Sequence, residues 1–260
     1  MTWFEALILG ILQGLTEFLP ISSSGHLELG KAILGVDAER SLIFTVVVHG
    51  ATVMSTIVVF YREIGKLFRG VAAFRWNEET RYVALILVSL IPVLIVGFFF
   101  RDFVESLFNG NMVFVGSMLL VTAVLLFSTH IRRNNRRNIG FMDAFVIGIA
   151  QMLAVVPGIS RSGATISTGL LLGNKKEDVA RFSFLMVLIP IIGANLMDLL
   201  KGNMTQDGGI SALPLMIGFF AAFFSGWLAC RWMINIVKRG KLYYFGIYCV
   251  IAGVIAIITA

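Results

Sequence analysis

The segment VVPGISRSG (residues 155–163) breaks an apolar stretch with a proline, two glycines and an arginine between two serines. Proline and glycine end helices, so the chain turns here. The surrounding stretch, 142–172, lies between two basic loops at 132–137 and 175–181, which hold four and three Lys or Arg residues. Short loops rich in Lys and Arg face the cytoplasm. Both loops therefore lie on one side, and 142–172 is predicted to be a re-entrant helical hairpin.

The composition of the whole chain is that of a membrane protein. Of its 260 residues, 58% are hydrophobic and 14% are charged, and the mean hydropathy is +0.89. Soluble domains have about 25% charged residues. We therefore expect an all-α polytopic membrane protein with about six full transmembrane helices, and no secretory segment removed before the first of them. The apolar stretches are Leu42–Phe60, Tyr82–Phe100, Val113–Thr129, Phe182–Leu199, Leu213–Leu228 and Tyr243–Ile258.

The basic residues set the expected orientation in the membrane. Sixteen of the 21 Lys and Arg residues fall in four segments, which we place in the cytoplasm. This accounts for the net charge of +6 without a nucleic-acid partner. Counted back through three spans, the N-terminal stretch 3–30, broken at Pro20, becomes a second hairpin that enters from the outside, and both termini are external. The basic segments are 62–81, 132–137, 175–181 and 231–241.

The two hairpins are related by an internal repeat. When the sequence is shifted by 138 residues, nine of the twenty positions 6–25 are identical, and Glu5 matches Asp143 in charge. Three spans, an odd number, separate the copies, so the repeat is inverted, and such repeats hold a site at the membrane midplane. We expect one integral membrane domain over all 260 residues, with repeats at about 1–130 and about 140–260. Broken hairpins also predict a polar cavity where they meet.

The turn of the first hairpin carries several groups that bind anions. Gln13 and Glu17 share one helix face at i, i+4, and Pro20 ends that helix. Serine is a favoured N-cap, and the free N–H groups of a helix N-terminus attract anions. His26 follows the turn, where it suits acid–base or nucleophilic work beside a phosphate, and Ser23 is a candidate nucleophile near a His and a Glu. The other turn residues expected to contact substrate are Ser22, Ser24 and Gly25.

The second hairpin repeats this anion site and adds Arg161. An arginine within an apolar hairpin costs roughly 3 kcal/mol on insertion scales. It is explained by a structural pair with a carboxylate such as Glu17, by an anionic ligand, or by both, since a guanidinium binds phosphate through two hydrogen bonds. Glu17 is likewise a counter-ion or a functional carboxylate, and His49 is a packed polar residue or part of the cavity wall. The residues expected to hold substrate beside Arg161 are Gly158, Ser160, Ser162, Gly163 and Thr165.

These residues resemble the motifs of the undecaprenyl-diphosphatase family, the bacitracin-resistance type. QGLTE (13–17) resembles the first motif, which is Glu or Gln, three residues, then Glu, and it runs into FLPISSSGH (18–26). Residues 157–165 resemble the second motif, P-G-x-S-R-S-x-x-T, without a mismatch. The resemblance covers essentially the whole chain.

The resemblance implies hydrolysis of a C55 polyisoprenyl diphosphate to the monophosphate and inorganic phosphate in the bacterial inner membrane, with recycling of the lipid carrier and resistance to bacitracin. It also implies a divalent cation, Mg²⁺ or Ca²⁺, held by Glu17 and Gln13. In that scheme Arg161 neutralises phosphate, Glu17 positions the diphosphate or activates the nucleophile, and Ser23 or His26 attacks, or His26 activates water. Gln13 stands where many members have Glu, and a neutral amide binds metal more weakly and cannot act as a base.

A transporter or flippase for an anion or a polyprenyl phosphate is the alternative, since inverted repeats and broken helices are common in transporters. The presence of both His26 and Glu17 near the serine turn favours the enzyme, because anion binding alone needs no acid–base pair. A structural scaffold gives no reason for Arg161. The expected partners are the lipid substrate and the membrane, with no nucleic acid, and a homodimer stays open.

Overall fold

The computed structural model describes residues 1–36, 42–107, 110–131, 136–200 and 211–259. Within these ranges the chain forms helices and no named strand, which confirms the predicted all-α membrane fold. The helices are α1 (Trp3–Phe18), α2 (Ser23–Leu34), α3 (Leu42–Val59), α4 (Tyr61–Ala72), α5 (Glu78–Phe99), α6 (Arg101–Ser106), α7 (Met112–Ser128), α8 (Phe141–Leu153), α9 (Arg161–Leu171), α10 (Lys176–Met186), α11 (Leu188–Leu200), α13 (Ala212–Arg239) and α14 (Tyr243–Ile258).

Five of the six predicted spans each follow one helix, and the sixth, Phe182–Leu199, is divided between α10 and α11. Within the described residues, α5, α13 and the run Lys176–Met197, which joins α10 to most of α11, are each long and apolar enough to cross a membrane. α3 and α4 pass the same test together, but α4 bends away from α3 by 77°. α7 and α14 are apolar and shorter, at 17 and 16 residues. The chain is therefore a multi-pass membrane protein whose spans differ in length.

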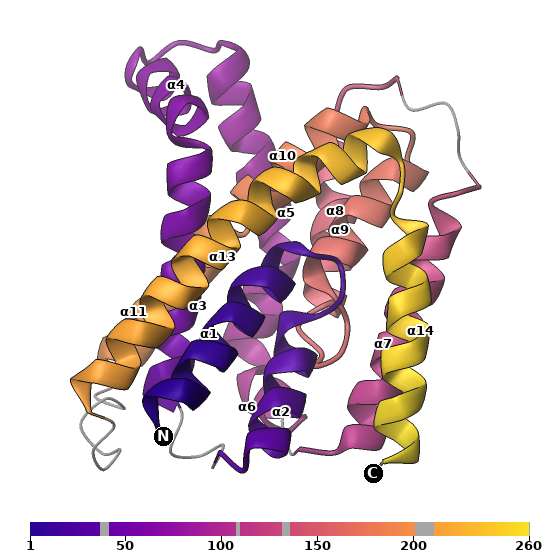
Figure 1. Ribbon diagram of the computed structural model, residues 1–260. Helices are drawn as coiled ribbons and strands as arrows, with labels where there is room; N and C mark the ends of the chain where they lie inside the picture. Colours follow the sequence, from indigo (N-terminus) through magenta and orange to yellow (C-terminus); the bar gives the residue numbers. More distant parts are fainter. Residues whose placement is uncertain (37–41, 108–109, 132–135, 201–210, 260) are drawn as a thin grey trace.

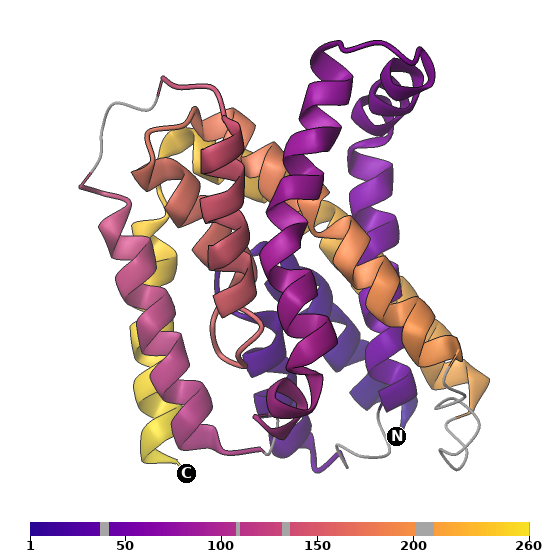
Figure 2. The ribbon, with the colours of Figure 1, turned by 180° about the vertical axis from the view of Figure 1, so that it is seen from behind.

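The two hairpins enter the helical bundle from opposite ends and meet near its middle (Figures 1 and 2). Residues 19–22 join α1 to α2, and residues 154–160 join α8 to α9. Both termini lie at the end from which the first hairpin enters (Figure 1). α4, α10 and the junction of α13 with α14 lie at the other end, with three of the four basic segments. The fourth segment, 132–137, falls mostly outside the described residues.

The first helix of each hairpin packs against a long helix of the other half of the chain through a glycine. A Cβ on Gly10 of α1 would lie 2.6 Å from the Gly218 carbonyl oxygen of α13. A Cβ on Gly148 of α8 would lie 2.3 Å from the Ser89 carbonyl oxygen of α5. Small residues let membrane helices approach this closely. Gly10 and Gly148 are equivalent in the 138-residue repeat, so the two halves interlock through the same contact.

Both hairpins begin with the same kind of helix cap. The Thr2 hydroxyl accepts from the Glu5 amide at 3.3 Å, and the Glu5 carboxylate accepts from the Thr2 amide at 2.9 Å. At the equivalent positions the Asp143 carboxylate accepts from the Gly140 amide at 3.0 Å. Asp143 also accepts from the Asn174 side chain at 3.0 Å, which ties the two ends of the second hairpin together. The acidic match seen in the sequence is therefore a shared N-terminal cap.

Candidate active site

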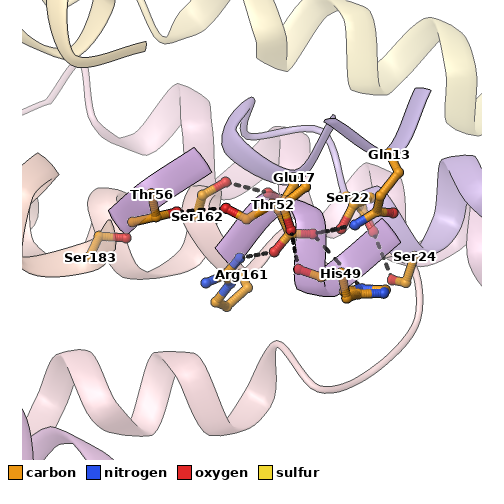
Figure 3. A network of polar contacts seen from close by, with 12 residues as sticks. Gln13, Glu17, Ser22, Ser24, His49, Thr52, Thr56, Arg161, Ser162 and Ser183 are labelled. Atoms are coloured by element: carbon orange, nitrogen blue, oxygen red, sulfur yellow. Dashed lines mark hydrogen bonds and ion pairs between the residues drawn. The ribbon is translucent and has the colours of Figure 1, made fainter. Parts of the chain in front are cut away.

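Glu17 is the centre of a polar network at the C-terminal end of α1, where the hairpins meet (Figure 3). Its Oε2 accepts hydrogen bonds from the Gln13 side chain at 2.9 Å and from the Ser23 hydroxyl at 2.7 Å. Its Oε1 accepts from the Arg161 guanidinium. Glu17 is buried, with 6% of its surface exposed. The structure thus brings three of the predicted site residues together around the carboxylate of a fourth, Glu17.

Arg161 is the first residue of α9 and reaches from the second hairpin to the first. Its ion pair with Glu17 is largely enclosed, with side chains 18% and 5% exposed. Taking charges out of water is costly, and a buried charge is tolerated when a partner neutralises it. The pair therefore joins the two hairpin tips. It also keeps a cation in the apolar interior, where an anionic ligand can compete with the carboxylate for it.

Ser22 builds the turn of the first hairpin. Its hydroxyl accepts from the Gly25 amide at 3.3 Å and lies 3.3 Å from the Ser24 hydroxyl. Ser22 has a φ of +70°, a backbone conformation that residues with a side chain rarely adopt. The Ser22 hydroxyl caps its own helix. The strained turn places Ser23 so that its hydroxyl donates to Glu17.

Ser160 builds the turn of the second hairpin in the same way. Its hydroxyl accepts from the Gly163 amide at 3.1 Å and lies 3.3 Å from the Ser162 hydroxyl. Ser162 also donates to the Leu19 carbonyl of the first hairpin at 3.2 Å. The second turn is thus fixed both to its own helix and to the neighbouring turn.

Gly158 and Thr165 hold the second hairpin in place. Gly158 has a φ of +95°, and a Cβ there would lie 2.5 Å from the Val115 carbonyl oxygen, so glycine is required. The Thr165 hydroxyl donates to the Arg161 carbonyl at 2.8 Å and lies 2.6 Å from the Ser183 hydroxyl of α10. These contacts position the start of α9, and with it Arg161, against the flanking helices.

His26 lies apart from the Glu17 network. Its Nδ1 is 2.8 Å from the Ser22 carbonyl oxygen, and its Nε2 is 2.7 Å from the Tyr248 hydroxyl of α14. Within the described residues, no hydrogen bond or ion pair joins His26 to Glu17. The hydrogen bonds of His26 are therefore made to Ser22 and Tyr248, outside the Glu17 network. Tyr248 was not predicted, because nothing in the local sequence links it to a histidine 222 residues away.

His49 is the histidine that faces Glu17. Its Nε2 lies 4.0 Å from Glu17 Oε2, and its Nδ1 is 2.8 Å from the Thr45 carbonyl oxygen. The sequence left His49 open between a packed polar residue and part of the cavity wall. Its position in the middle of an apolar span was the available signal, because a polar residue at membrane depth is a functional candidate.

The space beside the Glu17–Arg161 pair is small. A cavity lined by these two residues, Thr52, Thr56 and apolar side chains has a volume of about 10 Å³, which is room for about one water molecule. This cavity is too small to hold a diphosphate. A larger groove of about 670 Å³, lined mainly by apolar side chains, lies between α1, α13 and α14.

The residues around Glu17 fit a cation that shares ligands with a phosphate. Within the described residues, no three His, Cys, Asp or Glu side chains are grouped as a metal site. Gln13 Oε1 is buried and finds no hydrogen-bond partner there, so one oxygen beside Glu17 is available. Mg²⁺ commonly binds one or two carboxylates together with substrate phosphates. The donor set is too small to hold a cation alone and suits one that phosphate oxygens complete.

Comparison with known proteins places the chain in a family. Residues 6–255 match the family model described as bacitracin resistance protein BacA. The undecaprenyl-diphosphatase of Parabacteroides distasonis is 57% identical over 260 residues, covering 99% of this chain and 98% of that protein. The protein of the same name from Carboxydothermus hydrogenoformans is 39% identical, covering 98% and 96%. The two-hairpin protein with its Glu17–Arg161 pair therefore belongs to the bacitracin resistance protein BacA family.

Proposed function

We propose that this protein is an integral-membrane phosphatase that hydrolyses undecaprenyl diphosphate to undecaprenyl phosphate and inorganic phosphate. The reaction recycles the lipid carrier of cell-wall synthesis, and resistance to bacitracin follows at the level of the family. Relatives that carry the name undecaprenyl-diphosphatase are similar over nearly the whole chain. The observation that carries the proposal is the buried Glu17–Arg161 pair at the meeting point of the hairpins, with the Ser23 hydroxyl on the same carboxylate.

The contacts of Glu17 support a role for Ser23 as nucleophile. The diphosphate takes Arg161 from Glu17, and Arg161 then neutralises the phosphate charge together with the N–H groups of the two helix starts. Ser23 Oγ attacks the terminal phosphorus while Glu17 accepts its proton, and the bridging P–O bond breaks to release undecaprenyl phosphate. Water, with His26 as its base, then hydrolyses the phosphoserine and releases inorganic phosphate. Phosphoryl transfer depends mainly on positioning and charge stabilisation, which suits several groups around one anion.

Water activated by His26 is the other route to the same products. In that scheme His26 takes a proton from water, which attacks the phosphorus directly, and no phosphoserine forms. The 2.7 Å hydrogen bond from Ser23 to Glu17 favours the first route, because it places a hydroxyl and a base in contact.

A divalent cation, Mg²⁺ or Ca²⁺, is part of the proposal. When bound, it supplies positive charge to the diphosphate, and the Glu17 carboxylate and Gln13 Oε1 are its protein ligands. The buried, unpartnered Gln13 Oε1 supports this assignment. The amide of Gln13 holds the cation less strongly than a carboxylate does, so we expect the cation to bind together with substrate.

The proposed setting is the bacterial inner membrane, with the basic end of the bundle in the cytoplasm and both termini outside. The asymmetric distribution of Lys and Arg supports this orientation. The matched caps and glycine contacts of the two hairpins support a single domain built from repeats at about 1–130 and about 140–260.

Phosphate release from undecaprenyl diphosphate by the purified protein in detergent tests the activity. We expect release that requires Mg²⁺ or Ca²⁺, stops with a chelator, and is lost in Arg161→Ala and reduced in His26→Ala. A folded protein that releases no phosphate, yet moves labelled undecaprenyl phosphate across vesicle membranes, would overturn the phosphatase in favour of the flippase. Arg62→Ala is the matched control, since Arg62 is an exposed arginine of α4.

A further inference from the structure

Two hydrogen bonds of different kinds hold the ring of His26. Its Nδ1 lies 2.8 Å from the Ser22 carbonyl oxygen, which can only accept, so Nδ1 carries a proton. In the neutral ring Nε2 then has the lone pair, and it lies 2.7 Å from the Tyr248 hydroxyl, which donates to it. A single tautomer of neutral His26 satisfies both contacts.

Tyr248 also sets the plane of the histidine. The two rings stack with their centroids 5.5 Å apart and their planes at 19°. His26 is 6% exposed, whereas Tyr248 is 44% exposed and lines the apolar groove between α1, α13 and α14. Tyr248 therefore stands at the boundary between the buried histidine and a groove open to apolar ligands.

We propose that Tyr248 is a positioning residue for the reaction, which orients the ring of His26 through its hydroxyl and its stacked ring, while the Ser22 carbonyl fixes the proton on Nδ1. This inference rests on the proposed phosphatase activity and on a part for His26 in it. Nε2 accepts from the Tyr248 hydroxyl with its one lone pair, so a proton taken from water or from another hydroxyl reaches Nε2 through the Tyr248 oxygen, as the Tyr248 proton moves to Nε2. Without the Tyr248 hydroxyl, Nε2 loses its donor, and only the Ser22 carbonyl restrains the orientation of the ring.

The substitution Tyr248→Phe tests the proposal because it removes the hydroxyl and keeps the stacked ring. We expect kcat to fall about tenfold, the size of one neutral hydrogen bond, with KM changed less than twofold. Tyr243→Phe is the matched control. Tyr243 lies on the same helix and also contacts a histidine, His130, with ring centroids 6.2 Å apart and no hydrogen bond between them in the described part of the chain. Its kcat should match the wild type.

Nitrogen-15 spectra of histidine-labelled protein give a second readout, which a general loss of packing would not reproduce. The chain has three histidines, so His26 is assigned by its substitution. We expect the wild type and both variants to show His26 protonated on Nδ1, because the Ser22 carbonyl remains, and only Tyr248→Phe to shift the Nε2 signal, because Nε2 loses its hydrogen bond.

Three results would overturn the positioning role. They are a wild-type His26 protonated on Nε2, an unchanged kcat in folded Tyr248→Phe, and a raised KM with unchanged kcat, which makes Tyr248 a lipid contact. The wild-type spectrum decides the tautomer even where Tyr248→Phe fails to fold. A wild type that releases no phosphate defeats the proposed function, while an Nδ1-protonated His26 whose Nε2 signal shifts in Tyr248→Phe still supports the contact between Tyr248 and the ring.

Discussion

In the first hairpin, Ser22 caps α2 by accepting a hydrogen bond from the amide three residues on, and 138 residues later Ser160 caps α9 in the same way. In each turn the capping hydroxyl also lies 3.3 Å from the hydroxyl two residues on. The residue between these two serines differs, being Ser23 in the first turn and Arg161 in the second. Both contact the same carboxylate, Ser23 on Oε2 and Arg161 on Oε1 of Glu17.

The comparison shows that the two turns share their hydrogen bonds but carry different charged and polar side chains. Glu17 and His26 of the first hairpin correspond to Val155 and Ala164 of the second, so the acid and the histidine occur once. The basic side chain also occurs once, as Arg161. Neither hairpin alone carries both the charge that we propose binds a phosphate and the groups that we propose act on it. The network around Glu17 exists because the two turns of the repeat meet.

The largest effect should come from the residue that distinguishes the first turn. We expect Ser23→Ala to reduce phosphate release about 10⁴-fold, because a nucleophile has no substitute among its neighbours. Ser23→Thr keeps a hydroxyl and should retain part of the activity. Turnover of Ser23→Ala within tenfold of the wild type would assign the attack to water.

Arg161, at the equivalent position of the second turn, should rank next. We expect Arg161→Ala to reduce turnover about 10³-fold, since the phosphate loses its guanidinium and Glu17 is left buried without its partner. Arg161→Lys keeps the charge but loses the planar fork of the guanidinium, so its turnover should lie between those of Arg161→Ala and the wild type. Steady-state phosphate release by monodisperse protein measures the effect. Near-normal turnover in Arg161→Ala would remove the second hairpin from the chemistry.

The two caps should lose similar stability when the hydroxyl is removed, because they make the same hydrogen bond, but they should respond differently to glycine. Ser22→Ala loses the cap and keeps a side chain at the positive φ that the wild type already has, so we expect a loss of about 1 kcal/mol. Ser160→Ala, at a φ of −75°, should lose about 1 kcal/mol. Ser22→Gly should be milder than Ser22→Ala, because glycine accepts positive φ. Thermal unfolding in detergent compares the stability of the three variants. A Ser22→Gly variant less stable than Ser22→Ala would contradict backbone strain at this turn.

The smallest effect is expected at the paired glutamines. Both polar side-chain atoms of Gln151 are buried without a partner in the described structure, so Gln151→Leu should leave stability unchanged or raise it by about 1 kcal/mol. Gln13, its equivalent, donates to Glu17, so Gln13→Leu should lower activity. The same two assays measure both variants. A strongly destabilised Gln151→Leu would reveal a buried polar partner for this amide.

Much of the fold could be predicted, because each signal was local. Pro157 and Pro20 mark the hairpin turns, and the basic segments put the two hairpins at opposite ends. The pairing of Arg161 with Glu17 was also within reach, since a charge in an apolar segment needs a partner and few carboxylates lie at that depth. The roles of these residues in a reaction stay predictions for the experiments above.

The contacts of the histidines could not be predicted in the same way. His26 follows the serine turn in sequence, yet its ring points to Tyr248 on α14. His49 comes from α3 and is the histidine that faces Glu17. Helix periodicity says which residues share a face, and it does not say which distant helix covers that face. The nearly closed cavity beside Arg161 likewise depends on side chains from several helices.

The amino-acid sequence by itself determined the class of protein, the two hairpins, their inversion and the residues of the turns. Composition, helix-breaking residues and the side on which Lys and Arg gather act through the solvent and the local backbone, so they can be read without a partner. Only the tertiary structure decided that Ser23 and Arg161 bind the two oxygens of the Glu17 carboxylate, that His49 faces it, and that Tyr248 hydrogen-bonds His26. These contacts join residues far apart in the chain, and side-chain direction and helix packing together choose them.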